Sequence, residues 1–170
     1  MRPLVLENSV SEKLSSNDCQ VNCKSDNIER FEENLKLLKK EHHSSCMFNN
    51  PDSLVPDLDF TFDNRGNLSG TFICNRTHQG YDDMVHGGVI AAIIDASMAQ
   101  CLMGHGVVGY TTGLSIKYRK PLFIGFESKL ETSIESVHIG SLFEMKCEIT
   151  QNKKRVVQAK GRFFKVNHKN

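Results

Sequence analysis

Residues 86–103 read HGGVIAAIIDASMAQCLM, and this stretch decides the fold. After the two glycines almost every residue is apolar or small, and Asp95 is the one ionisable side chain. A helix that is apolar on all sides is a buried helix, and this one is shorter than the roughly 20 apolar residues of a membrane span. Gly104 and Gly106 predict its end. We therefore expect a long helix at the centre of a globular domain.

Strand patterns lie on both sides of this helix. Before it, residues 58–62 and 68–74 flank a polar turn, which is typical of a β-hairpin. After it, residues 110–118 have the pattern of a strand, and a meander of three long strands follows at residues 126–137, 142–150 and 156–166. The apolar face of such a sheet needs a partner. We therefore expect an α+β fold in which an antiparallel sheet is wrapped around the central helix.

The N-terminal part of the chain has a different character. Residues 1–25 are rich in Ser, Asn, Asp and Lys without clear periodicity, so we expect a flexible tail there. Asp26 is a candidate helix cap with Glu29 as its capping-box partner, and apolar residues then recur at helical spacing. We expect an extra helical segment over residues 26–50, whose helix ends near the two histidines at 42–43. The main domain is expected at residues 51–170.

Charge and cysteine usage bear on the function class. The 170 residues carry a net charge of +1, so no overall basic excess predicts binding to nucleic acid or to a membrane surface. Met1–Val10 lacks the basic and apolar regions of a secretory signal. Four of the six cysteines lie in or beside apolar stretches, and Cys19 and Cys23 lack a second pair with zinc-ligand spacing. We expect reduced thiols in the cytoplasm, no metal and no cofactor.

The loop before the central helix carries the chemistry. Residues 78–88 read HQGYDDMVHGG, and Asp95 follows two helical turns later. With this motif the chain resembles the hotdog-fold thioesterases, in particular their phenylacetyl-CoA thioesterase-like branch. The order of elements matches over residues 57–166, and the first fifty residues lie outside the resemblance. The resemblance implies a hotdog fold and hydrolysis of an acyl-CoA thioester to a carboxylic acid and free CoA, with coenzyme A present only as part of the substrate.

Two residues are the principal catalytic candidates. Free amides at a helix N-terminus are partly positive, and Gly87 and Gly88 let a substrate carbonyl approach the backbone. The Gly87 amide is therefore a candidate oxyanion donor, although the two glycines could also serve only tight packing. A buried carboxylate in mid-helix is costly, which makes Asp95 a candidate general base. The sequence leaves open whether Asp95 instead attacks directly as a nucleophile.

The spacing of these candidates predicts an oligomer. Gly87 and Asp95 are eight residues apart, so about 12 Å along one helix, and one carbonyl cannot contact both. They could meet only if a second copy packs its helix antiparallel, which gives a homodimer, or a dimer of dimers, with equivalent sites. Small residues near that face leave room for a partner helix or a ligand: Gly88, Ala91, Ala92 and Ala99.

The resemblance implies further site residues. A Ser or Thr at the place of Thr111 holds the attacking water in similar thioesterases, the alternative being an ordinary strand threonine. Gln79 or His78 is expected to contact the thioester carbonyl, although the match to the upstream Asn or Gln of relatives is shifted by a residue. His86 is either a general base or, as we prefer, an orienting residue of the loop, and Gly88 is expected to lie against the substrate.

The basic pair Arg119 and Lys120 follows the strand at residues 110–118. These side chains are candidates for binding the phosphates of coenzyme A, the alternative being two solvated charges. No Gly-x-Ser-x-Gly elbow is present, which disfavours a serine hydrolase. The principal alternative function is a non-catalytic acyl-CoA-binding or sensing protein on the same fold. A dehydratase and a purely structural dimer fit less well, because the former needs a different His-and-acid pattern and the latter leaves Asp95 unexplained.

Overall fold

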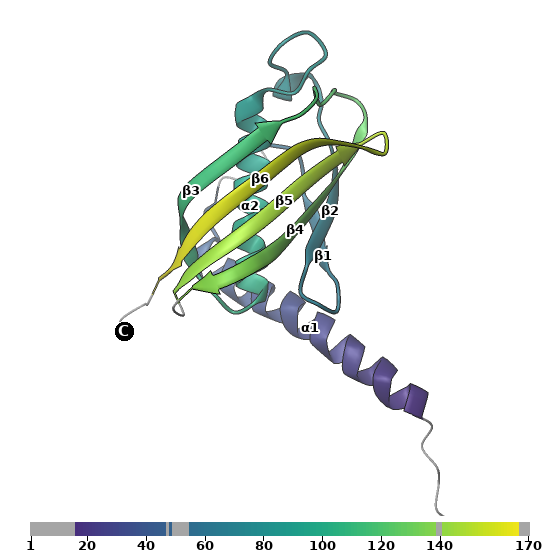
Figure 1. The fold of residues 1–170 in the computed structure, drawn as a ribbon, viewed down its shortest axis with the longest axis vertical. Coiled ribbons are helices and arrows are strands. Elements are labelled where there is room, and N and C mark those ends of the chain that lie inside the picture. The colour runs from purple at the N-terminus through teal and green to yellow at the C-terminus, as the bar shows by residue number, and fades with distance from the viewer. Residues whose placement is uncertain (1–15, 47, 49–54, 139–140, 167–170) are drawn as a thin grey trace, which may run out of the picture.

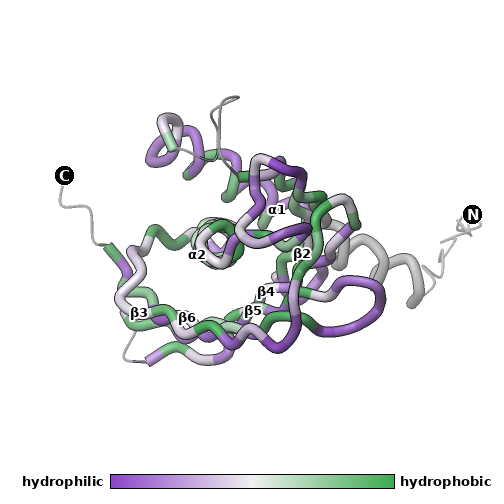
Figure 2. Tube along the Cα trace, turned by 90° about the horizontal axis from the view of Figure 1, so that it is seen from above, coloured by the Kyte–Doolittle hydropathy of each residue, from purple (hydrophilic) through white to green (hydrophobic). Residues whose placement is uncertain are grey.

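The computed structural model describes residues 16–46, 48, 55–138 and 141–166, and its strands form one antiparallel sheet curled around a central helix (Figures 1 and 2). The strand order is β1-β2-β4-β5-β6-β3. The strands are β1 (Asp59–Phe62), β2 (Leu68–Ile73), β3 (Gly109–Tyr118), β4 (Glu127–His138), β5 (Leu142–Gln151) and β6 (Lys154–Lys165). The expected hairpin, strand and meander are confirmed, with ends that differ by one or two residues.

Helix α2 (Gly87–Gly104) is the expected central helix, and it lies in the hollow of the curved sheet (Figure 2). Its side chains toward the sheet are fully buried, among them Ile93, Ile94 and Met98. Contrary to the expectation from its length, α2 is long and apolar enough to cross a membrane, but most of it is buried inside the domain, as in the core helix of a globular protein. The all-round apolar sequence is thus explained by burial between the sheet and a second helix.

That second helix, α1 (Ser16–His42), packs against the side of α2 away from the sheet (Figure 2). It begins at Ser16, so the predicted start at Asp26 is wrong and residues 16–25 are helical rather than part of a loose tail. This stretch contains neither proline nor glycine, so no helix breaker interrupts it. The predicted end near residue 42 is confirmed. The rest of the expected tail, residues 1–15, lies outside the described residues.

One cluster of contacts fastens α1 to the C-terminal end of α2. Phe31 is buried and its ring stacks on that of Phe62 at a centroid distance of 5.6 Å. The same ring lies 4.7 Å from the ring of His105, the residue that caps α2. Asn34 Nδ2 donates a 3.0 Å hydrogen bond to the Gly104 carbonyl, which satisfies one of the free carbonyls at the helix end. The N-terminal helix is therefore an integral part of the core.

Strand β3 lies at one edge of the sheet and pairs with β6. The pairing register shifts between Thr111 and Gly113, so Thr112 is an extra residue in this strand. Side chains alternate between the faces of a regular strand, so residues seven apart, such as Thr111 and Tyr118, would lie on opposite faces. The extra residue corrects the alternation. Both side chains consequently reach α2, as their hydrogen bonds show.

The cysteines of the core are free thiols. Cys74, Cys101 and Cys147 are buried, as the sequence predicts, and Cys46 is half-buried. Burial raises the pKa of Cys74 to about 11 and that of Cys101 to about 12. These thiols are therefore protonated and act as small apolar core residues.

Candidate active site

The N-terminus of α2 presents free backbone donors. His86 caps the helix, and its Nδ1 accepts a 2.9 Å hydrogen bond from the Gly88 amide. No acceptor for the Gly87 amide is found among the described residues, and the first amides of a helix have no partner within it. The cap thus occupies the Gly88 amide and leaves the Gly87 and Val89 amides without an acceptor among the described residues. Of these two residues only Gly87 lines the hollow described next, so its amide is the donor that a ligand there could use. It also gives His86 the orienting role that the sequence favours.

A surface hollow of about 430 Å³ opens beside this amide. Val85, Ile90 and Leu122 give it an apolar floor, and Arg119 and Lys120 line its rim. The structure therefore brings the predicted oxyanion donor and the predicted phosphate-binding pair to the same hollow. An apolar floor with a few polar groups is the usual character of a small-molecule site.

Tyr118 also lines this hollow, and the sequence reasoning missed it. Its hydroxyl donates a 2.9 Å hydrogen bond to the Gly87 carbonyl, which fixes the first turn of α2 against β3. Burial raises the pKa of Tyr118, so the phenol stays protonated and keeps donating. The sequence signal that could have identified Tyr118 is its position directly before the basic pair. The direction of its side chain depended on the extra residue at Thr112, which the strand pattern does not reveal.

The second candidate group lies two turns along the helix. Thr111 Oγ1 donates a 2.6 Å hydrogen bond to Asp95 Oδ1, so strand and helix bring together the two residues that the sequence paired. In the single chain Asp95 is half-buried rather than buried, so the expectation of a fully desolvated carboxylate is corrected. An oriented carboxylate beside a hydroxyl can hold and deprotonate a water molecule.

Asp95 lies on the least buried face of α2. Gly88 is exposed, and Ala91, Ala92, Asp95 and Ala99 are half-buried, whereas most residues on the other sides of the helix are buried. These positions repeat every three or four residues and so form one stripe. The small side chains leave room for a ligand or for another helix, as the sequence predicts.

Two residues that were predicted to contact the thioester carbonyl do not line the hollow at Gly87. The side chain of His78 is buried, and its Nδ1 accepts a 2.9 Å hydrogen bond from the Asn75 amide. Its carbonyl accepts from the His86 amide, so His78 shapes the loop. Gln79 is exposed in a separate hollow with Arg76. Neither side chain lines the hollow at Gly87, and the structure gives His78 a structural role.

Within one chain the two catalytic candidates stay apart. They belong to the same helix, and about 12 Å separates their positions along its axis. The Gly87 end faces Tyr118, and the Asp95 end faces Thr111. No group of three or more His, Cys, Asp or Glu side chains that could hold a metal ion occurs in the described part of the chain.

Comparison with known proteins shows what this chain is similar to. Residues 83–158 match the family model of the thioesterase superfamily. Acyl-coenzyme A thioesterase THEM4 of Rattus norvegicus is 33% identical over 91 residues, which cover 52% of this chain and 39% of that protein. The chain therefore spans about two fifths of the length of this curated relative.

Solved structures agree on the fold. The PaaI protein from the E. coli phenylacetic acid degradation operon gives a TM-score of 0.68 at 13% identity, over 83% of this chain and 96% of that one. Thioesterase superfamily member 2 from Mus musculus gives 0.62 at 16% identity, over 81% and 97%. A hypothetical thioesterase with coenzyme A from Streptococcus pneumoniae TIGR4 gives 0.60 at 18% identity, over 68% and 91%. The chain therefore has the hotdog fold, as the sequence predicts, and its residues 83–158 are similar to the thioesterase superfamily.

Proposed function

We propose that this chain hydrolyses acyl-CoA thioesters to a carboxylic acid and free CoA, and that it works as a homodimer or a dimer of dimers. Each site would combine the Gly87 amide of one subunit with Asp95 of its partner. The thioesterase-superfamily match supports the reaction, and the acyl-coenzyme A thioesterase relative supports the substrate class. The free thiols of the core fit a reducing compartment, and we propose the cytoplasm.

One observation supports a site that two subunits form together. The Tyr118–Gly87 contact and the Thr111–Asp95 contact lie at opposite ends of the same edge strand, β3. If two copies join these edges antiparallel, the Tyr118 end of one strand lies beside the Thr111 end of the other. The same operation sets the Gly87 end of one helix beside the Asp95 end of its neighbour. The small-residue stripe on α2 would let the two helices approach.

The proposed reaction uses only groups of the chain and water. The thioester oxygen accepts the hydrogen bond of the Gly87 amide, which stabilises the charge that develops there. Asp95 of the partner, oriented by Thr111, takes a proton from a water molecule whose oxygen attacks the carbonyl carbon. The tetrahedral intermediate collapses, the C–S bond breaks and the CoA thiolate leaves. Direct attack by Asp95 would instead give a mixed anhydride that water then cleaves.

A mixed-subunit experiment tests the shared site. Gly87→Pro removes the proposed donor while keeping the helix, because proline is favoured at the first helical position. His86 already has the extended backbone that precedes proline, with φ −60° and ψ 133°. A Cβ at Gly87 meets the Tyr118 hydroxyl at 3.6 Å, an ordinary contact. The two parent proteins, Gly87→Pro and Asp95→Asn, should both be nearly inactive against acyl-CoA.

A heterodimer of these two variants, isolated through two affinity tags, should regain half of the wild-type activity. One of its sites combines an intact Gly87 with an intact Asp95, whereas the other carries both lesions. The reciprocal control pairs a wild-type subunit with a subunit that carries both substitutions, and it should be nearly inactive because each site then lacks one group. The opposite pattern would place each site within a single chain. Absence of turnover in the wild type on every acyl-CoA would favour the acyl-CoA-binding alternative.

A further inference from the structure

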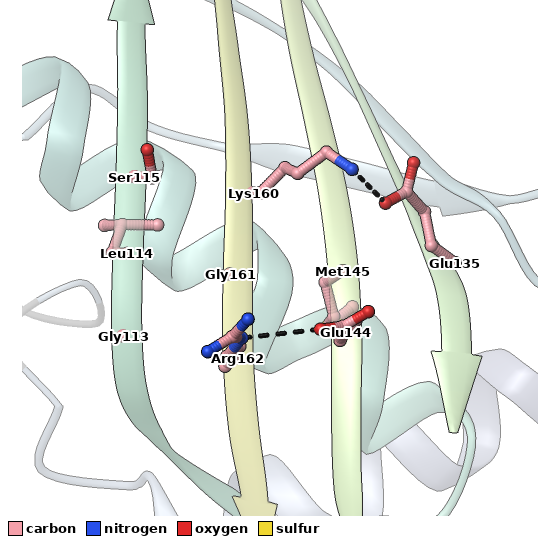
Figure 3. Close-up of a pocket in the computed structure, with 9 residues that line it drawn as sticks. All are labelled: Gly113, Leu114, Ser115, Glu135, Glu144, Met145, Lys160, Gly161 and Arg162. Carbon is pink, nitrogen blue, oxygen red and sulfur yellow. Dashed lines mark hydrogen bonds and ion pairs between the residues drawn. The ribbon is translucent and has the colours of Figure 1, made fainter. Parts of the chain in front are cut away.

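The outer face of the sheet, away from α2, carries two adjoining hollows between β3, β6 and β5. Figure 3 shows the first, of about 390 Å³. Its two cations are matched by two carboxylates: Lys160 pairs with Glu135 at 3.0 Å, and Arg162 pairs with Glu144 at 3.4 Å. This hollow is electrically balanced and has no surplus charge for a ligand.

The second hollow, of about 250 Å³, shares Ser115 and Lys160 with the first and has a different charge. Four basic side chains line it and no acidic one does. We call it the basic furrow and define it by Lys117, Arg119, Lys146 and Lys160. Four cations around one concavity attract anions.

Strand geometry explains why these cations converge. Lys117 on β3 and Arg119 directly after its end are two residues apart, on the face opposite Tyr118. Lys146 of β5 lies directly across from Lys160 of β6 in the sheet register. Like charges directly opposite one another are destabilising. The fold therefore maintains an unfavourable pair at this place.

Neighbouring glutamates compensate only part of this charge. Lys160 pairs with Glu135, and Lys146 pairs with Glu148 at 3.0 Å. Glu148 also pairs with Arg155 at 2.9 Å, so one carboxylate serves two cations. Burial alone would raise its pKa, but hydrogen bonds from Lys146 and other neighbours outweigh this and lower the pKa of Glu148 to about 2.

The β3 side of the furrow lacks acidic partners. Lys117 faces Gln158 across the strands and makes no ion pair with any residue that the structure describes. Arg119 donates to the side-chain oxygen of Gln158 at 2.9 Å rather than to a carboxylate. Because the Gln158 side chain is neutral, it does not compensate the positive charge of Lys117 or Arg119.

Arg119 connects the furrow to the candidate active site, because it lines both the furrow and the hollow at Gly87. We propose that the basic furrow binds the phosphate groups at the nucleotide end of coenzyme A while the thioester lies at Gly87. Arg119 would hold a phosphate by paired hydrogen bonds, and the lysines would act as point charges. This inference rests on the proposed function for its substrate, and it adds an anion subsite on the outer face of the sheet.

Binding and kinetics of the full chain test the furrow. Lys117→Gln breaks no ion pair among the described residues. It should weaken the binding of coenzyme A and of adenosine 3′,5′-bisphosphate about tenfold, as measured by calorimetry. In turnover it should raise KM for an acyl-CoA by a similar factor at unchanged kcat. It should leave hydrolysis of the matching S-acyl-N-acetylcysteamine unchanged, because that thioester has no nucleotide. Dephospho-CoA shows how much of the effect belongs to the 3′-phosphate.

The matched control is Lys129→Gln, which removes a lysine of β4 that pairs with Glu131 at 2.7 Å and does not line the furrow. It should change none of these values. If both variants lose the same affinity for coenzyme A, or if Lys117→Gln impairs hydrolysis of S-acyl-N-acetylcysteamine as much as that of acyl-CoA, the furrow is not a phosphate site. If coenzyme A binding depends on Lys117 but the wild type hydrolyses no thioester, the furrow stands and the proposed function fails.

Discussion

The Thr111 hydroxyl donates a 2.6 Å hydrogen bond to Oδ1 of Asp95 and thereby joins the edge strand to the central helix. A bond this short between a hydroxyl and a carboxylate is charge-assisted and strongly directional. It fixes one carboxylate oxygen and leaves the other free to contact a water molecule. Strand β3 therefore carries both the residue that orients the proposed base and, at its other end, the tyrosine that holds the first turn of α2.

Replacing Asp95 by Asn should lower kcat for acyl-CoA hydrolysis by at least about a hundredfold, because the amide cannot accept the proton of the water. Stopped assays over short, long and aromatic acyl-CoAs measure the effect. Asp59→Asn, at an exposed position of β1, is the matched control and should retain full activity. Wild-type kcat in Asp95→Asn would remove Asp95 from the mechanism.

Replacing Thr111 by Val should lower kcat roughly tenfold, since a hydrogen bond to a charged group contributes about 1.5 kcal/mol or more. Thr111→Ser keeps the hydroxyl and should restore most of the rate. Thr112→Val is the control on the same strand, because that hydroxyl donates to the Arg162 carbonyl instead. If the Thr111 and Thr112 variants have equal rates, Thr111 is an ordinary strand residue.

Tyr118→Phe removes the hydrogen bond to the Gly87 carbonyl and keeps the ring. A neutral hydrogen bond contributes about 1 kcal/mol, so we expect kcat to fall several-fold as the first turn of α2 loosens. Tyr110→Phe, also exposed on β3, should have no effect on kcat. Amide hydrogen exchange at residues 87–91 gives an independent readout, and it should rise only in Tyr118→Phe.

The cluster that joins the two helices should be important for stability. Phe31→Ala removes a buried ring and should lower the free energy of unfolding by about 3–5 kcal/mol in urea denaturation. Leu37→Ala on the same helix is the control, because Leu37 is 64% exposed and its loss should cost under about 0.5 kcal/mol. Similar midpoints for both variants would show that α1 contributes little to the core.

Stability should depend on pH through His78. Burial lowers its pKa below 6.5 in the folded chain, and its Nδ1 already accepts from the Asn75 amide. The unfolded chain therefore binds the proton more readily, and the free energy of unfolding should fall as the pH drops below about 6.5. Above that pH the imidazole is neutral in both states and contributes no slope. His78→Gln should flatten the acid limb relative to the wild type, and an identical limb would contradict this account.

The sequence predicts the elements of this fold well because each has a strong local pattern. Helix α2 follows from its all-round apolar run, and the hairpin turn follows from its polar residues between alternating strands. The early start of α1 was missed because Asp26 with Glu29 makes a convincing cap signal, whereas the chain continues the helix through it.

The site was harder to predict, because its geometry depends on contacts between distant segments. The extra residue at Thr112 leaves no mark on the sequence, yet it decides that Tyr118 reaches Gly87. The roles of His78 and Gln79 follow from how the loop folds back, through the bond from the His86 amide to the His78 carbonyl. Asp95 was predictable as the one carboxylate of an apolar helix, whereas Thr111 was predictable only through the resemblance to thioesterases.

Strand β3 has a further consequence for how the protein is made. This ten-residue strand pairs with β6 on one side, and no described strand covers the other. An uncovered edge strand of this length has unpaired backbone N–H and C=O groups, to which another extended segment can hydrogen-bond. In the proposed dimer the partner subunit would cover this edge, so a newly synthesised subunit would expose it until the dimer forms. Substitutions that prevent dimerisation should therefore yield insoluble aggregates in the cell rather than a well-behaved monomer.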